Sequence, residues 1–154
     1  MKKILVAVGV FIAALGGYAS NDMLGAGVNT GERTMLNEVI AVTTSSAFLV
    51  NDFRNIEITV ANTALTGTIK AVCSAQTDVD FDAVPSATNR YDTVELIDLS
   101  DGSSLPGSTG IVASADTSVS QYEVNANNFY YCAVVLQPFT SGTSTVKLRP
   151  ANNQ

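Results

Sequence analysis

The sequence has no histidine and no tryptophan, and only two of its 154 residues are cysteines. Without histidine the chain lacks the commonest general base and the commonest protein ligand of transition metals. Two cysteines are too few for a disulfide-dense scaffold, and without histidine or a Cys-x-x-Cys pair they do not make a zinc site. Composition therefore favours binding or assembly over catalysis, and it predicts a protein that is not an enzyme and has no cofactor.

Charge is also scarce. Charged residues make up 14% of the chain and the formal net charge is −6. Because phosphate backbones attract basic surfaces, and no basic stripe compensates for this balance, we expect no direct nucleic-acid binding. The apolar content of 46% argues against disorder, and the length suits one domain with a substantial core.

The first residues form a separate segment. Lys2 and Lys3 precede the apolar run 4–15, and Gly17-Tyr18-Ala19 supplies a small-x-small exit before Ser20. This pattern is typical of a secretory signal peptide. A membrane anchor with contact through residues 4–18 and a retained structural helix are the alternatives, because the run is short for a bilayer span. We therefore treat residues 1–19 as one of these three.

The remainder alternates short apolar runs with turn residues, which is the all-β pattern. Ile56, Ile58 and Val60 share one face of a predicted strand, and Glu57 lies on the opposite, solvent-facing side together with Thr59. Residues 62–67 are predicted as a turn, which would pair this strand with 68–75 as a hairpin. Further strands are expected at 39–42, 47–50, 91–99, 111–113, 118–124, 129–136 and 143–149.

These strands predict an antiparallel two-sheet sandwich over residues 38–150. A jelly roll is the leading topology. An immunoglobulin-type sandwich is the alternative, weakened by the absence of tryptophan. Residues 20–37 are expected to form an extended arm and 151–154 a tail. The loops at 76–90 and 100–110 are candidates for contacts with partners.

The two cysteines, Cys73 and Cys132, both lie inside predicted strands. A disulfide between them would fix those strands together if the protein reaches an oxidising compartment. The alternative is a pair of buried free thiols that pack as small hydrophobic side chains.

Three carboxylates recur at every second residue in the first long connection: Asp78, Asp80 and Asp82. They are weak candidates for a calcium site, since oxygen ligands suit that ion, but the EF-hand pattern fails. The alternative is a solvated acidic loop, and we predict no metal site elsewhere. Glu57 and Glu123 are expected to be isolated charges on solvent-facing sides of strands.

The aromatic run Phe129, Tyr130 and Tyr131 supplies the candidate interface residues. Strand alternation would place Phe129 and Tyr131 on one side and Tyr130 on the other. Core packing explains part of this run, and tyrosine is enriched where subunits meet.

The turn-and-strand pattern of residues 53–149 resembles small structural proteins of bacteriophage virions, among the capsid, decoration and tail-associated β proteins. The residues that carry this resemblance are Phe53-Arg54-Asn55-Ile56, Gly67-Thr68-Ile69, Asp80-Phe81, Ser86-Ala87-Thr88-Asn89, Asp92-Thr93-Val94, Ile97-Asp98-Leu99, Asp101-Gly102, Gly107-Ser108-Thr109-Gly110-Ile111 and Tyr122-Glu123-Val124-Asn125. The resemblance spans about two-thirds of the chain and implies no active-site residue.

Two functional hypotheses follow. The first, implied by the resemblance, is a non-enzymatic subunit of a virion, located in the particle, whose partners are further copies of itself and other virion proteins. The second is a secreted or surface-anchored bacterial β-sandwich that acts as an adhesin, a filament subunit or a glycan-binding module. The signal-like start and the cysteine pair favour the second hypothesis.

Overall fold

The computed structural model describes residues 31–151, and within that range it contains strands and no helix. The predicted all-β, antiparallel class is therefore confirmed. The predictions for residues 1–19, for 20–30 of the arm and for 152–154 of the tail lie outside the described residues. The strands are β1 (Arg33–Val39), β2 (Thr43–Thr44), β3 (Phe48–Leu49), β4 (Asn55–Ser74), β5 (Asp92–Thr93), β6 (Leu96–Asp98), β7 (Ser104–Leu105), β8 (Ile111–Asp116), β9 (Val119–Asn125) and β10 (Tyr131–Ala151).

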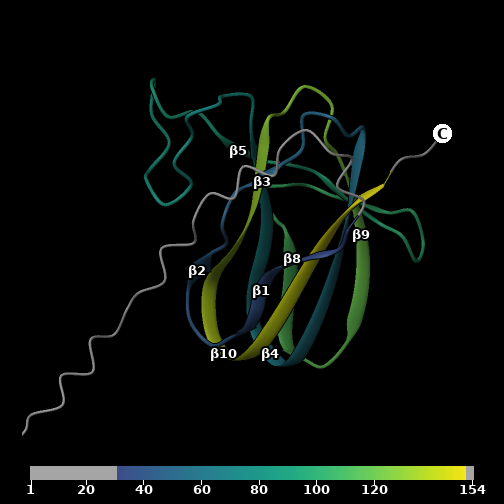
Figure 1. Ribbon diagram of the computed structural model, residues 1–154. Coiled ribbons are helices and arrows are strands. Elements are labelled where there is room, and N and C mark those ends of the chain that lie inside the picture. Colours follow the sequence, from purple (N-terminus) through teal and green to yellow (C-terminus); the bar gives the residue numbers. More distant parts are fainter. Residues whose placement is uncertain (1–30, 152–154) are drawn as a thin grey trace, which may run out of the picture.

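All ten strands belong to one hydrogen-bonded sheet, with the order β1-β10-β4-β9-β6-β7. Two short strands, β2 and β3, also pair with β10, and β5 and β8 also pair with β4. Figure 1 shows β10, in yellow, curving beside β4, in teal. These two strands are 21 and 20 residues long, and they pair with each other from Tyr131↔Ser74 to Ala151↔Asn55.

The long strand β4 folds back on itself. Its two ends are joined through the short segment 126–130, in which the Ala126 N–H donates to the Arg54 carbonyl (2.7 Å) and the Tyr130 N–H donates to the Ser74 carbonyl (2.8 Å). Five residues span at most about 18 Å. A straight strand of this length would span about 65 Å. The sheet is therefore bent sharply about a line near the middle of β4, which we call the crease.

Each chain segment that crosses the crease does so with one residue in the left-handed region. These residues are Glu38 (φ 47°), Ala64 (φ 47°), Ala115 (φ 52°) and Gly142 (φ 89°). They lie next to one another across the sheet, because the pairs Val39↔Ser144, Thr143↔Thr63 and Leu65↔Asp116 flank the crease. A left-handed residue reverses the local course of a strand, so four of them in a row bend the whole sheet along one line.

Side-chain hydroxyls replace ladder partners at the crease. The Glu38 N–H donates to Thr145 Oγ1 (3.1 Å), the Ala64 N–H to Thr117 Oγ1 (2.8 Å) and the Ala115 N–H to Thr66 Oγ1 (3.0 Å). Backbone donors that leave a ladder need another acceptor, and here threonine supplies it, from neighbouring strands at Thr145 and Thr66 and from the link between β8 and β9 at Thr117. Threonine residues near the crease therefore stabilise the bend by accepting backbone hydrogen bonds.

The predicted turn at 62–67 is wrong, and so is the hairpin built on it. Residues 56–60 and 68–74 lie in successive halves of β4, which pair with β10 rather than with each other. In the same way, the two strands predicted at 129–136 and 143–149 belong to the single strand β10, which begins at Tyr131 and contains residues 131–136 and 143–149. Residues 62–67 are polar and contain glycine because the strand bends there, at the crease, and not because the chain reverses in a turn.

Two further boundaries differ from the predictions. The expected strand 91–99 is divided into β5, which pairs with β4 at Thr93↔Val72, and β6, which pairs with β9 at Ile97↔Glu123. The chain therefore passes from one half of the bent sheet to the other between them. Residues 33–37, expected in the arm, form the first part of β1 on the outer side of β10.

The core lies inside the bend. Both halves of β4 contribute to one buried cluster, through Ile56, Ile58 and Val60 on one side of the crease and Ile69, Ala71 and Cys73 on the other. The predicted alternation of Ile56, Ile58 and Val60 is confirmed, because all three are buried. A smaller cluster of Val72, Phe81 and Ala133 lies outside the main core.

Candidate interaction surfaces

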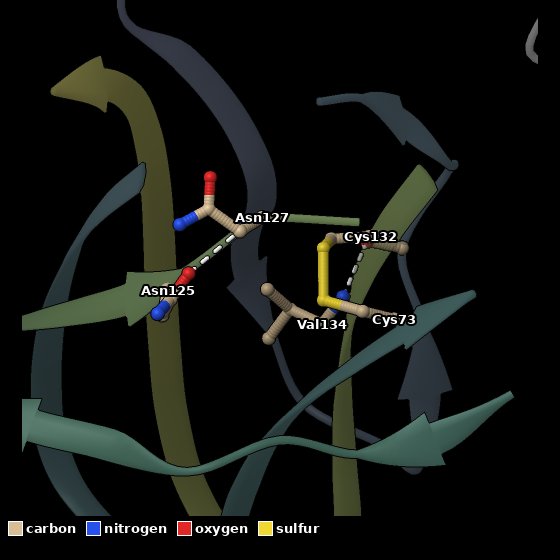
Figure 2. The surroundings of a disulfide bond; sticks show 6 residues. Cys73, Asn125, Asn127, Cys132 and Val134 are labelled. Carbon is tan, nitrogen blue, oxygen red and sulfur yellow. Dashed lines mark hydrogen bonds between the residues drawn. A yellow bond between two sulfur atoms is a disulfide. The ribbon is translucent and has the colours of Figure 1, made fainter. Parts of the chain in front are cut away.

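Cys73 and Cys132 are bonded in the structure, with an S–S distance of 2.02 Å and a Cα–Cα distance of 4.1 Å. They are a directly opposed pair of the β4–β10 ladder, and Figure 2 shows the yellow S–S bond joining these strands beside Val134. Each cysteine is 1% exposed. Solvent reductants have no direct access to the bond in the folded protein, and it ties together the two longest strands.

The aromatic run divides between two clusters. Phe129 packs against the main core and Tyr131 against the outer cluster, while Tyr130 is 43% exposed. The predicted placement of Phe129 and Tyr131 on one side is wrong, because β10 begins only at Tyr131 and Asn128 has a φ of 70° in the preceding turn. Of the three, Tyr130 is the side chain most available to a partner.

The connection between β4 and β5 is folded against the outside of the sheet. Phe81 of this connection is 8% exposed, and its ring lies 5.2 Å from that of Tyr91 at an interplanar angle of 60°. The Tyr91 hydroxyl donates to the Ala83 carbonyl (2.7 Å). Burial raises the pKa of Tyr91, and the neighbouring charges of Asp80 and Asp82 raise it further. We call residues 75–91 the outer loop.

The outer loop does not assemble the calcium site that was considered for Asp78, Asp80 and Asp82. Within residues 31–151 no group of three or more metal-binding side chains comes together. The Asp80 carboxylate instead accepts the Asp82 N–H (2.9 Å), and the Asn89 side chain holds the Asp80 backbone through bonds of 2.8 and 2.7 Å. The Asp80 carboxylate thus shapes the loop, and the structure does not bring the three aspartates together.

Glu57 is not an isolated surface charge. Its residue exposure is 9%, and its carboxylate accepts bonds from Arg149 Nη2 (2.6 Å) and Gln121 Nε2 (3.1 Å). The Glu57 carboxylate raises the pKa of the Arg149 guanidinium, by hydrogen bonding first and by charge second. Glu123, directly opposite Glu57 in the ladder, accepts a bond from Asn55 Nδ2 (3.0 Å). The solvent-facing interpretation was wrong because cross-strand partners enclose Glu57.

Apolar side chains border the polar row formed by Arg149, Glu57, Gln121 and Glu123. Ile97 and Leu99 are 38% and 45% exposed, and Val119 is 72% exposed. Leu99 and Val119 line the same surface depression, and the Leu99 N–H donates to the Gln121 carbonyl (2.9 Å). We call Ile97, Leu99 and Val119 the apolar border. It combines with the polar row to give a mixed face of the kind found at protein interfaces.

A polar network that is buried at Asn62 and Ser144 and half-buried at Asp116 and Ser118 crosses the crease, and the sequence analysis did not find it. The Ser144 hydroxyl donates to Asn62 Oδ1 (2.9 Å), and Asn62 Nδ2 donates to Asp116 Oδ2 (3.0 Å), which also accepts from Ser118 (2.5 Å). The hydrogen bonds from Asn62 and then Ser118 lower the pKa of Asp116. The sequence contained one signal for this network. Asn62 continues the alternation of Ile56, Ile58 and Val60, and this pattern places its side chain on the buried face.

The comparisons with known proteins concern the fold. No family model matches the chain, and no curated protein matches it. Its fold is that of a protein of prophage origin. The crystal structure of the SPBc2 prophage-derived protein YomS superposes with a TM-score of 0.57, covering 79% of this chain and 92% of that one. The identity is 9%, so the similarity concerns the fold alone.

No helix between residues 31 and 151 has the length and apolar character needed to cross a membrane.

Proposed function

We propose that this protein is a non-enzymatic structural subunit of a virion, a capsid or decoration protein that assembles through its β domain and its N-terminal arm. Its partners are further copies of itself and other virion proteins, with membrane contact through residues 4–18 as an additional expectation. Its location is the particle. The two halves of the bent sheet act as the layers of a jelly-roll-like sandwich.

The observation that carries this proposal is the match to 92% of a prophage-derived chain. A fold shared over nearly a whole domain supports a common origin, although fold alone does not assign function. The surface adds support, because the apolar border and the Glu57–Arg149 pair lie on neighbouring strands of one face. Apolar groups next to paired charges give both contact area and orientation.

The test is particle association. Particles from the producing culture are purified on a density gradient, and each fraction is assayed for the intact chain by mass spectrometry. We expect the chain to co-migrate with the particles and to remain with them after a salt wash. Recovery only in the particle-free fractions would contradict the proposal.

A second candidate function is a secreted or surface-anchored bacterial β-sandwich, acting as an adhesin, filament subunit or glycan-binding module. The Cys73–Cys132 bond favours it, because disulfides persist in oxidising compartments. Intact mass measured without reductant separates the two functions. A chain that begins at Ser20 with the disulfide formed supports secretion, and a chain that keeps residues 1–19 supports the virion subunit.

A further inference from the structure

We infer that the open edge of β8 pairs with β8 of a second copy of this chain, so that the bent sheet continues from one subunit into the next. This inference rests on the proposed assembly function and names the surface that performs it. One edge of β8 is bonded to β4 through Ile111↔Ile69, Val112↔Thr68 and Ala113↔Gly67. Within the part of the chain that the structure describes, no strand pairs with the other edge.

Over residues 111–113 the open edge of β8 lacks the devices that prevent strands from pairing, and the left-handed Ala115 and the register shift between Ala113 and Asp116 lie beyond this stretch. Exposed edges are usually protected by charges, proline, bulges or covering segments. Residues 111–115 contain neither charge nor proline, and the pairing of 111–113 with β4 is regular. Val112 is 68% exposed on this strand. The strand therefore offers backbone donors and acceptors beside an exposed apolar side chain.

The other long edge of the sheet is protected. β1 begins with the charged Arg33, and its pairing with β10 is interrupted by two register shifts. Its Glu38 carries both a charge and a left-handed backbone. These features bend β1 away from a straight partner, so β8 is the better edge for assembly.

A second copy is the occupant that fits best by charge. The chain carries a net charge of −6, so most encounters between copies place like charges together. Pairing through 111–113, with the two-fold axis at Val112, places only neutral residues opposite one another. The nearest carboxylate, Asp116, is bonded to Asn62 and Ser118 within its own subunit. An antiparallel pair of identical strands is also closed by two-fold symmetry, which satisfies both open edges at once.

The experiment compares Val112→Lys with Val84→Lys in the full chain by sedimentation velocity over a concentration series. Val84 is 83% exposed in the outer loop, so the two variants make the same change at exposed valines. We expect the wild type and Val84→Lys to dimerise with the same Kd, and Val112→Lys to weaken the dimer by about tenfold or more, because two like charges oppose across the two-fold axis. Hydrogen exchange should show protection of residues 111–113 that rises with protein concentration in the wild type and in Val84→Lys, but not in Val112→Lys.

Three results would overturn the inference. An unchanged Kd in Val112→Lys would exclude this edge, and a monomeric wild type would exclude self-pairing. Loss of dimer on deletion of residues 1–19, with Val112→Lys unaffected, would assign the contact to the N-terminal segment. Each of these results leaves particle association to be judged by the gradient experiment, so the edge can fail while the structural role stands.

Discussion

Gly142 lies directly against Ala64 at the crease: a Cβ atom placed on Gly142 would be 2.2 Å from the Ala64 carbonyl oxygen. Both residues have positive φ, so two left-handed positions on neighbouring strands pack backbone to backbone. The bend in the sheet therefore depends on the absence of a side chain at residue 142.

Replacing Gly142 with alanine should destabilise the protein severely. The added Cβ meets backbone atoms that cannot move aside, and a φ of 89° is unfavourable for alanine. We expect the free energy of unfolding, measured in guanidinium chloride, to fall by about 3 kcal/mol or more. The control is Gly102→Ala, where φ is also positive but no atom lies within 4 Å of the new Cβ. It should cost about 1 kcal/mol, and equal losses in the two variants would show that the contact is unimportant.

The disulfide should resist reduction until the protein unfolds. Because both sulfurs belong to buried residues, dithiothreitol should leave the native protein oxidised and reduce it only in denaturant, as read by intact mass. The double variant Cys73→Ala with Cys132→Ala should lose about 4 kcal/mol of unfolding free energy, from the closure of a long loop. Rapid reduction of the native protein would mean that the β4–β10 ladder opens locally.

The Asp116 network should make stability depend on pH below the ordinary aspartate range. Hydrogen bonds lower the pKa of Asp116 in the folded state, so its contribution is present above the unfolded value of about 3.9 and is lost as pH falls through the lower folded value. We expect the free energy of unfolding to fall less steeply between about pH 5 and pH 2 in Asp116→Asn than in the wild type, because Asp116 becomes protonated within this range.

Asp101 provides the comparison for that titration. Its pKa is also lowered, by hydrogen bonds from Ser103, but it lies in an exposed turn away from the crease. At pH 7, Asp116→Asn should destabilise the protein more than Asp101→Asn, because a neutral amide oxygen is a weaker acceptor than a carboxylate for the donors of Asn62 and Ser118. Equal loss in both would mean that Asp116 acts only as a surface turn residue.

The outer loop should open independently of the bent sheet. Phe81 anchors it in the small cluster with Val72 and Ala133, so Phe81→Ala removes most of its apolar contact. We expect hydrogen exchange in residues 76–90 to accelerate by about tenfold or more, with β9 unchanged. Val84→Ala, at an exposed position of the same loop, should leave exchange unaffected. Acceleration throughout the sheet would show that the loop and the core unfold together.

The sequence predicted what depends on local alternation. Ile56, Ile58 and Val60 alternate strictly, and their buried face follows from the pleat of any strand. It could not predict the crease, because Asn62, Thr63 and Gly67 have the composition of a turn whether the chain reverses or merely bends. The difference is decided by the partner: β10 bends at Gly142 beside β4, across a long sequence separation.

The same limit applies to the candidate sites. Glu57 was expected in solvent because alternation gives its face but not its neighbours, and Arg149 and Gln121 enclose it from two other strands. The three aspartates were grouped because they recur at every second residue, whereas Asn89 and Tyr91 fold the outer loop so that they do not converge. Pairings between distant segments decide such sites.

The position of β10 in the sheet also imposes an order of events during synthesis. It is the last strand of the described chain, yet β1, β2, β3 and β4 all pair with it. These four strands therefore cannot complete their backbone pairing until residues 131–151 have been synthesised. Cys73 likewise cannot form its disulfide before Cys132 is available. A nascent chain in that state exposes apolar strands such as 56–60, so we expect it to be a substrate for holding chaperones. The bent sheet can therefore be completed only after this last strand has been inserted.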